Sequence, residues 1–251
     1  MAVIAVAVSA APARADVIGR NHPNALWRVV HGLCVTDQKL LGLPAPCRRV
    51  DLRQGWALVK DSEQRSHLLL VPLRRISGIE SPALQERGSP NYWQYAWDQR
   101  GEFAALVGKP TPREDIGMAV NSLYGRTQNQ LHIHIDCLRP GVVQTLGFQL
   151  PFIGPAWSPL RGTVLTGYRA RLLLGAELGT RDPFKLLARA SSAARSDMTA
   201  QTLVVAAVTL RDGRPGFVLM AHEAQLPDWD VAGGEGLLDH SCAVLGGQRR
   251  R

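Results

Sequence analysis

Two histidines lie two residues apart in the segment from Gln130 to Asp136. If this segment is a β-strand, alternation places Gln130, His132, His134 and Asp136 on one face. The opposite face would be apolar, carrying Leu131, Ile133, Ile135 and Cys137. A neutral imidazole can attack phosphorus without the repulsion that an anionic nucleophile meets at a phosphoanhydride, and it forms a covalent phosphoramidate. The spacing therefore indicates chemistry at a phosphate.

The residues just before this segment are hydrogen-bond donors. Arg126 offers a guanidinium, Thr127 a hydroxyl and Asn129 an amide, beside the backbone N–H groups of a glycine-containing turn. Such donors stabilise the charge that spreads over phosphate oxygens during transfer. We therefore predict that this turn binds the phosphate under attack.

Two other interpretations of the histidine pair remain open. The pair could form the polar face of a structural sheet. It could also bind a metal, but no third His or Cys ligand lies nearby in sequence, so a distant residue would have to complete the site. The remaining histidines are predicted to be structural or exposed: His22, His31, His67, His222 and His240.

The composition is basic. A formal charge of +8 and a pI of about 9.9 favour anionic partners, whether nucleic acid, an acidic lipid surface or a phosphorylated substrate. The charges are scattered along the chain, so charge alone does not choose among these partners.

The first residues have the pattern of an export signal. Residues 1–11 are nearly all small and apolar, and Ala13-Arg14-Ala15 matches an A-x-A cleavage site. The apolar run is shorter than the ~20 residues that span a bilayer. We predict that residues 1–15 are a signal peptide or short membrane leader and that the chain is exported.

The four cysteines are interpreted in the light of export. An even count in an oxidising compartment predicts two disulfides, for which three connectivities are open. Cys34 and Cys47 flank a proline-containing stretch and would close a local loop, leaving Cys137 for Cys242. Four buried free thiols are the alternative.

The elements that must position the histidines form an α+β pattern in the first half of the chain. A helix is expected over residues 24–39 and a hairpin from residues 55–60 and 67–72. Ser89 and Pro90 would start a second helix that ends at Gly108. Two further strands are expected over residues 116–121 and 130–137.

The second half is predicted to begin with a loop-rich stretch up to Gly162. A strand or helix follows over residues 168–174, a helix over 183–194, and a hairpin of strands 202–210 and 216–222 around Asp212-Gly213. We divide the chain into a catalytic core, residues 16–142, and a C-terminal α+β portion of the same unit, residues 143–251.

A family resemblance supports this interpretation. The strand Leu131–Ile135, preceded by Gly-x-Thr, is similar to the H-φ-H-φ-H strand of the histidine-triad (HIT) superfamily. The run from Gly125 through Cys137 to Pro140 resembles the CDP-diacylglycerol pyrophosphatase family more specifically. The similarity covers roughly Cys34 to Cys242.

The resemblance implies a HIT-like antiparallel sheet with flanking helices and a C-terminal α+β extension packed on it. It implies that His132 is the nucleophile and that His134 contacts the phosphate, with Asn121 and Thr127 on the phosphate side. Gln130 stands where the superfamily has its first histidine, and it is predicted to be among the phosphate-binding residues.

The implied substrate is CDP-diacylglycerol, reached at a membrane surface on the periplasmic side of the inner membrane. No nucleic-acid partner, cofactor or metal is expected, so activity is predicted to survive EDTA. Two alternatives remain: a HIT-type hydrolase or transferase of a soluble nucleotide, and a non-catalytic module that binds anionic lipid or nucleotide.

Overall fold

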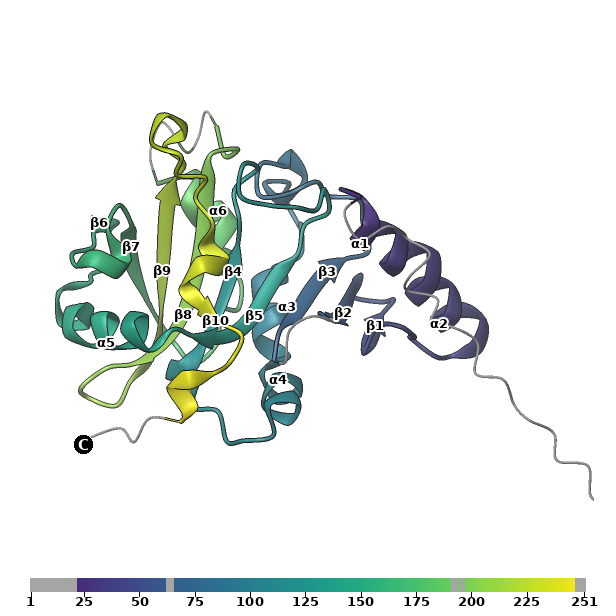
Figure 1. Cartoon of the computed structure of the whole chain (residues 1–251), viewed down its shortest axis with the longest axis horizontal. Coiled ribbons are helices and arrows are strands. Elements are labelled where there is room, and N and C mark those ends of the chain that lie inside the picture. The colour runs from purple at the N-terminus through teal and green to yellow at the C-terminus, as the bar shows by residue number, and fades with distance from the viewer. Residues whose placement is uncertain (1–21, 62–65, 191–193, 195–196, 247–251) are drawn as a thin grey trace, which may run out of the picture.

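The computed structural model describes residues 22–61, 66–190, 194 and 197–246. Within them, ten strands form one antiparallel sheet (Figure 1). The strands are β1 (Arg49–Asp51), β2 (Trp56–Lys60), β3 (Leu68–Pro72), β4 (Ile116–Val120), β5 (Ile133–Leu138), β6 (Ser158–Pro159), β7 (Arg169–Leu174), β8 (Gln201–Thr209), β9 (Pro215–Glu223) and β10 (Leu238–Asp239). The helices are α1 (Ala25–Trp27), α2 (Val35–Leu41), α3 (Tyr92–Asp98), α4 (Arg100–Val107), α5 (Pro140–Gln149) and α6 (Pro183–Ala188). A π-helical stretch, Arg28–Cys34, joins α1 to α2.

The strand order repeats across the middle of the sheet. It runs β1-β2-β3-β5-β4-β8-β9-β7-β6, so the four strands β2-β3-β5-β4 and the four strands β6-β7-β9-β8 follow the same pattern and meet where β4 pairs with β8. Each set also has a helical segment at the same place along the chain: α3–α4 lies between β3 and β4, and α6 lies between β7 and β8. The short β10 lies outside this pattern and pairs with the end of β5.

The two faces of the sheet carry different covers. One face packs on α3, α4 and α6, with Trp93, Trp97, Phe103 and Phe184 in the largest core cluster. The other face carries His132, His134 and Asp136, and we call it the histidine face. Burial of large aromatic side chains makes the first face the main source of hydrophobic stabilisation.

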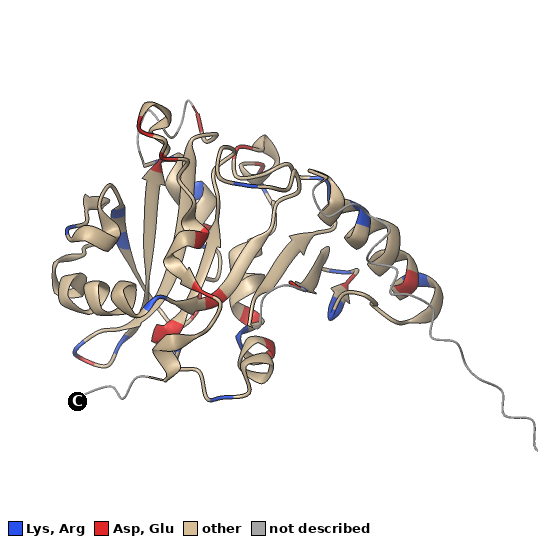
Figure 2. Ribbon diagram, viewed as in Figure 1, with Lys and Arg blue, Asp and Glu red and all other residues tan. Residues whose placement is uncertain are grey.

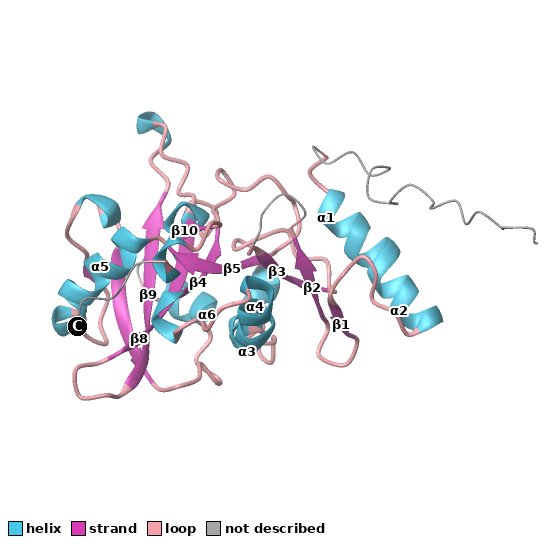
Figure 3. Ribbon diagram, turned by 60° about the horizontal axis from the view of Figure 1, so that its bottom comes forward, coloured by secondary structure: helices cyan, strands magenta, loops and turns pink. Residues whose placement is uncertain are grey.

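Two separate helical covers lie on the histidine face, one at each end of the sheet (Figure 3). The helical segment 25–41 packs on Ala57 and Val71 of β2 and β3. At the other end, α5 packs on β8 and β9 through Val142 and Leu146. The middle strands β5 and β4 are left to the C-terminal segment, residues 224–246, which crosses this face through Leu237 and Leu238. The polar strand positions thus lie between two apolar covers.

The α+β class and most of the predicted elements are confirmed. Both hairpins, β2–β3 and β8–β9, pair as predicted. The helical segment 25–41, the strand β7 and the helix end at Gly108, which has a left-handed φ of 71°, are also observed. The structure forms both predicted disulfides, Cys34–Cys47 and Cys137–Cys242.

Several local predictions were wrong. The helix predicted over residues 183–194 is shorter, because α6 ends at Ala188 and a turn follows it. The helix after Pro90 begins at Tyr92, because the Asn91 side chain rather than Ser89 accepts the capping hydrogen bond, from Gln94 N–H. It is also interrupted at Gln99, between α3 and α4. The stretch after Arg139 is helix α5, not loop, with Pro140 at its first position.

The remaining predictions concern the histidine strand, the leader and the division of the chain into two parts. The strand predicted over residues 130–137 begins only at Ile133 in the structure, so Gln130 and His132 lie just before it. The predicted leader, residues 1–15, lies outside the described residues. None of the described helices has the length and apolar character needed to cross a membrane. Residue 142, the predicted division of the chain, falls within α5, and the sheet continues through β4 and β8; the division itself stays a prediction.

The start of α6 gives a prediction about stability. Asp182 Oδ1 accepts from Phe184 N–H at 2.9 Å, whereas Oδ2 is buried without a partner in the described residues. Burial raises the pKa of this carboxyl to about 6. Because the folded state holds the proton more tightly than the unfolded state, the carboxylate is destabilising above pH 6, and this penalty disappears as the pH falls towards 4.

Asp182→Asn keeps the capping oxygen but removes the charge. We expect it to raise the free energy of unfolding by about 1–3 kcal/mol at pH 8, and by less at pH 5. Urea denaturation at the two pH values measures this. An equal change in the free energy of unfolding at the two pH values, or a loss at pH 8, would contradict the assigned cause.

Candidate active site

Four histidines meet on the histidine face. His132 lies just before β5 and His134 within it, His67 precedes β3, and His240 follows β10. Pairing of Leu68 with Ile135 sets His67 beside β5, and pairing of Asp239 with Cys137 sets His240 there. The cluster therefore depends on three strands that are far apart in the sequence.

The His132 ring has one defined tautomer. Its Nδ1 lies 2.7 Å from the backbone carbonyl of Gln130, and a carbonyl only accepts, so Nδ1 carries the proton. The lone pair is then on Nε2. Burial lowers the pKa of His132, although the Gln130 carbonyl opposes this shift. The ring is therefore neutral at neutral pH, with Nε2 available as a nucleophile.

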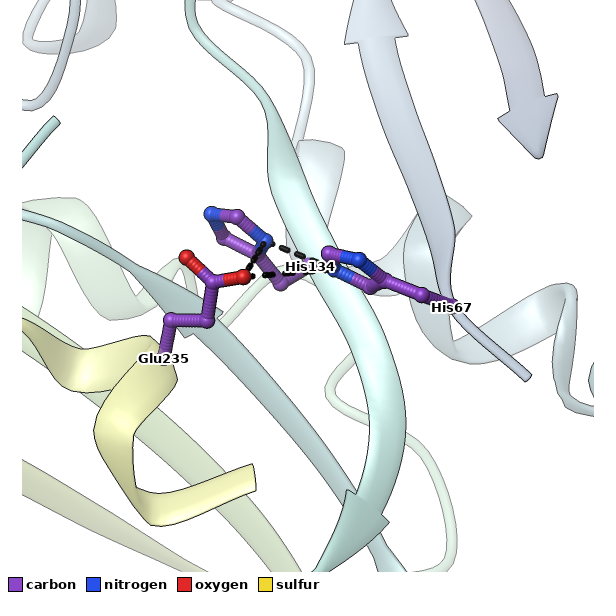
Figure 4. A group of neighbouring side chains, drawn as sticks. All are labelled: His67, His134 and Glu235. Atoms are coloured by element: carbon purple, nitrogen blue, oxygen red, sulfur yellow. Dashed lines mark hydrogen bonds and ion pairs between the residues drawn. The ribbon is translucent and has the colours of Figure 1, made fainter. Parts of the chain in front are cut away.

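His134 and His67 are in direct contact (Figure 4). His67 Nε2 lies 2.8 Å from His134 Nδ1, and the rings stack with centroids 4.9 Å apart. Burial, followed by the neighbouring imidazoles of His132, His67 and His240, holds the pKa of His134 well below its usual value. The other nitrogen, His134 Nε2, is buried and has no hydrogen-bond partner in the described part of the chain.

Asp136 anchors the last part of the C-terminal segment. Its Oδ2 lies 2.6 Å from His240 Nδ1, and its Oδ1 accepts from Ser66 Oγ at 2.6 Å and from Cys137 N–H at 2.8 Å. Burial raises the pKa of this carboxyl, and the hydrogen bonds from Ser66 and His240 oppose that shift. The Cys137–Cys242 disulfide fixes the same segment covalently beside Asp136.

Asn121 and Glu235 bind each other reciprocally. Asn121 Oδ1 accepts from the Glu235 backbone N–H at 3.0 Å, and Asn121 Nδ2 donates to Glu235 Oε2 at 3.3 Å. Glu235 Oε1 is left facing the histidines, 3.6 Å from His134 Nδ1, 4.0 Å from His67 Nε2 and 3.5 Å from His240 Nε2. Asn121 thus positions a carboxylate on the cluster.

Arg126 lies in a buried ion pair next to His132. Its Nη1 lies 2.6 Å from Glu80 Oε2, with the Arg126 side chain only 7% exposed. Burial disfavours the Glu80 carboxylate, but hydrogen bonds from Arg126 and Ser77 outweigh this and keep its pKa below its usual value. A Cβ on Gly78 would lie 1.8 Å from Arg126 Nη1, so this position must be glycine for the guanidinium to fit. Arg126 and His132 line the same small cavity.

The other predicted phosphate-binding residues have different surroundings. Thr127 and Asn129 are exposed, and Asn129 Oδ1 accepts from Arg126 at 3.3 Å. Gln130 is buried; its Nε2 donates to the carbonyls of Pro72 and Arg74, each at 3.0 Å, and its Oε1 accepts from Ile76 N–H at 3.4 Å. Gln130 therefore supports the chain after β3, so its amide is not directed at a phosphate.

Sequence reasoning missed three residues of the cluster. His67 and His240 were predicted to be structural or exposed; the structure places His67 against His134 and His240 near Glu235, and what these two histidines do stays a prediction. Glu235 was not singled out. His67 is the first residue of a predicted strand, and the predicted Cys137–Cys242 disulfide already placed the segment around His240 beside the histidine strand; no sequence pattern singles out Glu235.

An open cleft of ≈ 1090 Å³ lies along the C-terminal segment, lined by Asn121, Gly125, Arg139, Glu235 and His240 among others. Lys and Arg residues are spread over the elements of the fold (Figure 2). Among the described residues that are not disulfide-bonded, two groups of side chains could hold a metal: His67, His134 and Glu235, and His67, Asp136 and His240.

A buried, neutral imidazole with a free Nε2 beside a fixed guanidinium suits an enzyme that hydrolyses phosphoanhydrides. The profile of the CDP-diacylglycerol pyrophosphatase family matches residues 21–246. A CDP-diacylglycerol pyrophosphatase of Yersinia pestis is 38% identical over 226 residues, which cover 90% of this chain and 86% of that protein. The chain belongs to the CDP-diacylglycerol pyrophosphatase family.

Proposed function

We propose that this enzyme hydrolyses the pyrophosphate of CDP-diacylglycerol to CMP and phosphatidate, in phospholipid metabolism, through a nucleotidyl-histidine intermediate on His132. The family supports the substrate. The observation that carries the mechanism is the 2.7 Å contact from His132 Nδ1 to the Gln130 carbonyl, because it leaves the lone pair on Nε2.

The reaction has two displacements at one phosphorus. His132 Nε2 attacks the cytidylyl phosphorus, the bond from that phosphorus to the bridging oxygen breaks, and phosphatidate leaves with the bond electrons. Water then attacks the same phosphorus, its proton is released, and CMP departs from the imidazole. A neutral nucleophile meets less repulsion from the pyrophosphate charge than an anionic one would.

Three groups would bind the phosphate oxygens. Arg126 lines the cavity beside His132, and Glu80 fixes its orientation. His134 Nε2 has no other partner in the described residues, so a proton there would be available to a phosphate oxygen. The exposed Thr127 hydroxyl and the backbone of its turn would complete the shell. These are preorganised donors of the kind that stabilise transition-state charge.

We infer that the catalytic part of the sheet is HIT-like. The Gly-x-Thr turn that leads into the histidine strand supports this, as does the flanking-helix arrangement of β2, β3, β5 and β4. In the second set of strands, the corresponding face of β9 carries Val218 and Met220 under α5. The same face of β9 also carries His222, but its ring pairs with Asp230, so we assign the reaction to the imidazoles of the first set.

The test of the proposed function is release of CMP from CDP-diacylglycerol in detergent micelles, compared with release of mononucleotide from CDP-alcohols and dinucleotide polyphosphates. The proposal requires the highest kcat/KM with the lipid. Faster turnover of a soluble nucleotide would favour the second enzyme class, and binding without turnover would favour a binding module.

We further propose that the enzyme is exported and works at a membrane surface, with the loop from Leu226 to Val231 touching the bilayer. The Trp229 side chain is 92% exposed, with Leu226 and Val231 nearly half exposed beside it. Ser122 Oγ donates to the Val231 carbonyl, which ties the loop to the chain before Arg126. Exposed aromatic and aliphatic side chains next to a lipid-hydrolysing site suit an interfacial contact.

Trp229→Ser is expected to lower kcat/KM about tenfold for long-chain CDP-diacylglycerol in anionic vesicles. The reason is that an indole inserted into the bilayer contributes more than ~1 kcal/mol to interfacial binding, which the variant loses. Turnover of a short-chain analogue dissolved as monomers should stay within about twofold. Phe152→Ser is the matched control, since Phe152 is 84% exposed but lies beyond α5. An equal loss in both variants would contradict a docking role for this loop.

A further inference from the structure

We propose that His67 Nε2, His134 Nδ1 and Glu235 Oε1 bind one Zn²⁺ ion, which holds His134 with its Nε2–H directed to the phosphate (Figure 4). The role of the ion, though not its binding, rests on the proposed function.

The three ligand atoms have suitable separations. They lie 2.8 Å (His67 to His134), 3.6 Å (His134 to Glu235) and 4.0 Å (His67 to Glu235) apart. Metal–ligand bonds of about 2.1 Å in a tetrahedron place ligands about 3.4 Å apart, so small side-chain adjustments suffice. Two imidazoles and one carboxylate form a donor set that zinc commonly uses, with a position left open.

The neighbours of each ligand fit the same role. His67 Nδ1 lies 3.4 Å from Asp61 Oδ2, and Glu235 Oε2 accepts from Asn121 Nδ2 at 3.3 Å. Metal-binding histidines characteristically direct their second nitrogen to a carboxylate, and ligating carboxylates are themselves hydrogen-bonded. The atoms left over, Nε2 of His67, Nδ1 of His134 and Oε1 of Glu235, all converge on one point.

Without a cation, protons satisfy this arrangement poorly. If His67 Nδ1 carries its proton towards Asp61 and His134 Nε2 carries the other, two nitrogen lone pairs face each other at 2.8 Å beside a carboxylate oxygen. If His134 Nδ1 carries the proton instead, its Nε2 turns a lone pair towards an anionic substrate. If His67 Nε2 carries the proton and donates it to His134 Nδ1, the buried His67 Nδ1 keeps a lone pair 3.4 Å from the Asp61 carboxylate. A divalent cation accepts both lone pairs and leaves the proton on Nε2.

The charge balance gives a second, independent reason. Asp136 and Glu235 add negative charge to a site for a pyrophosphate, whereas the nearby Arg126 is ion-paired with Glu80. A Zn²⁺ ion bound by two neutral imidazoles and one carboxylate adds a net positive charge beside the substrate. His132 is not a ligand, because its Nδ1 is used by Gln130, so the attack step itself still needs no metal. A bound zinc ion would differ from the family resemblance, which implied a site without a metal.

The experiment uses the full chain with its disulfides intact and no affinity tag of histidines. Protein stripped with EDTA is incubated with ZnCl₂, passed through gel filtration and analysed for zinc by mass spectrometry. We expect one zinc per chain, and binding weakened at least ~100-fold in His67→Ala and in the nearly isosteric Glu235→Gln. Addition of ZnCl₂ should raise the Tm of wild type but not of Glu235→Gln.

Two controls separate this proposal from the catalytic one. His222→Gln removes a histidine paired with Asp230 elsewhere in the chain and should keep its zinc. His132→Ala should lose CMP release but keep zinc, so failure of the proposed activity does not affect this readout. A wild type without stoichiometric zinc, or a Glu235→Gln variant that binds it as tightly, would overturn the proposal.

Discussion

His132→Ala is expected to reduce CMP release by about 10⁴-fold or more, because it removes the only protein atom proposed to bond to phosphorus. The loss should fall on kcat, with little change in KM, since Arg126 and the turn before His132 remain in place. Steady-state assays with CDP-diacylglycerol in micelles measure both constants. Residual activity above a few per cent would rule out His132 as the nucleophile.

The variant needs a control for its fold and a direct view of the intermediate. His222→Ala is matched, because the His222 Nδ1 also lies beside a backbone carbonyl, that of Gly167 at 3.0 Å, but the residue is not part of the cluster. Rapid acid-free quenching of wild type with substrate labelled in the cytidylyl phosphate should trap label on the protein, and His132→Ala should trap none. Label on His134 instead would reassign the nucleophile.

Removal of the Cys137–Cys242 disulfide is expected to have the largest effect on stability. The disulfide closes a loop of 105 residues, and the chain-entropy relation gives about 5 kcal/mol for a loop of that length. The Cys34–Cys47 disulfide, with a separation of 13, corresponds to about 3 kcal/mol. Urea denaturation of the two double alanine variants should therefore differ by about 2 kcal/mol, with the long-range pair the more destabilising.

The same disulfide should also matter for activity, because Cys242 holds the segment that carries Glu235 and His240 on the histidine face. Cys137→Ala/Cys242→Ala is expected to lower turnover at temperatures where it is still folded, whereas Cys34→Ala/Cys47→Ala should not. Equal activities in the two folded variants would show that Asp136 and the β10 pairing hold the segment without the disulfide.

Local patterns in the sequence were sufficient to predict most of the elements and to single out the histidine pair; the role of His132 as nucleophile comes from the family resemblance and stays a prediction. The alternation around the histidines, the turn residues of two hairpins and the glycine at helix position 108 act over a few residues, so they can be recognised without a fold. Where two local signals competed, the interpretation was less accurate. Ser89 and Asn91 are both good N-caps, and only the packing of Tyr92 and Trp93 into the core favours a helix start at residue 92.

The assembled cluster was decided by the tertiary structure. His67 lies 67 residues from His134, and Glu235 and His240 reach β5 only because β10 pairs beside it and Cys242 bonds to Cys137. Strand pairing and disulfide choice are long-range, so they leave no periodic trace in the sequence. The sequence therefore led to the prediction of a nucleophile, His132, which lies just before β5, and to the prediction of the donors that precede it. The fold alone decided which imidazoles and carboxylate surround that nucleophile, because their positions depend on which strands become neighbours.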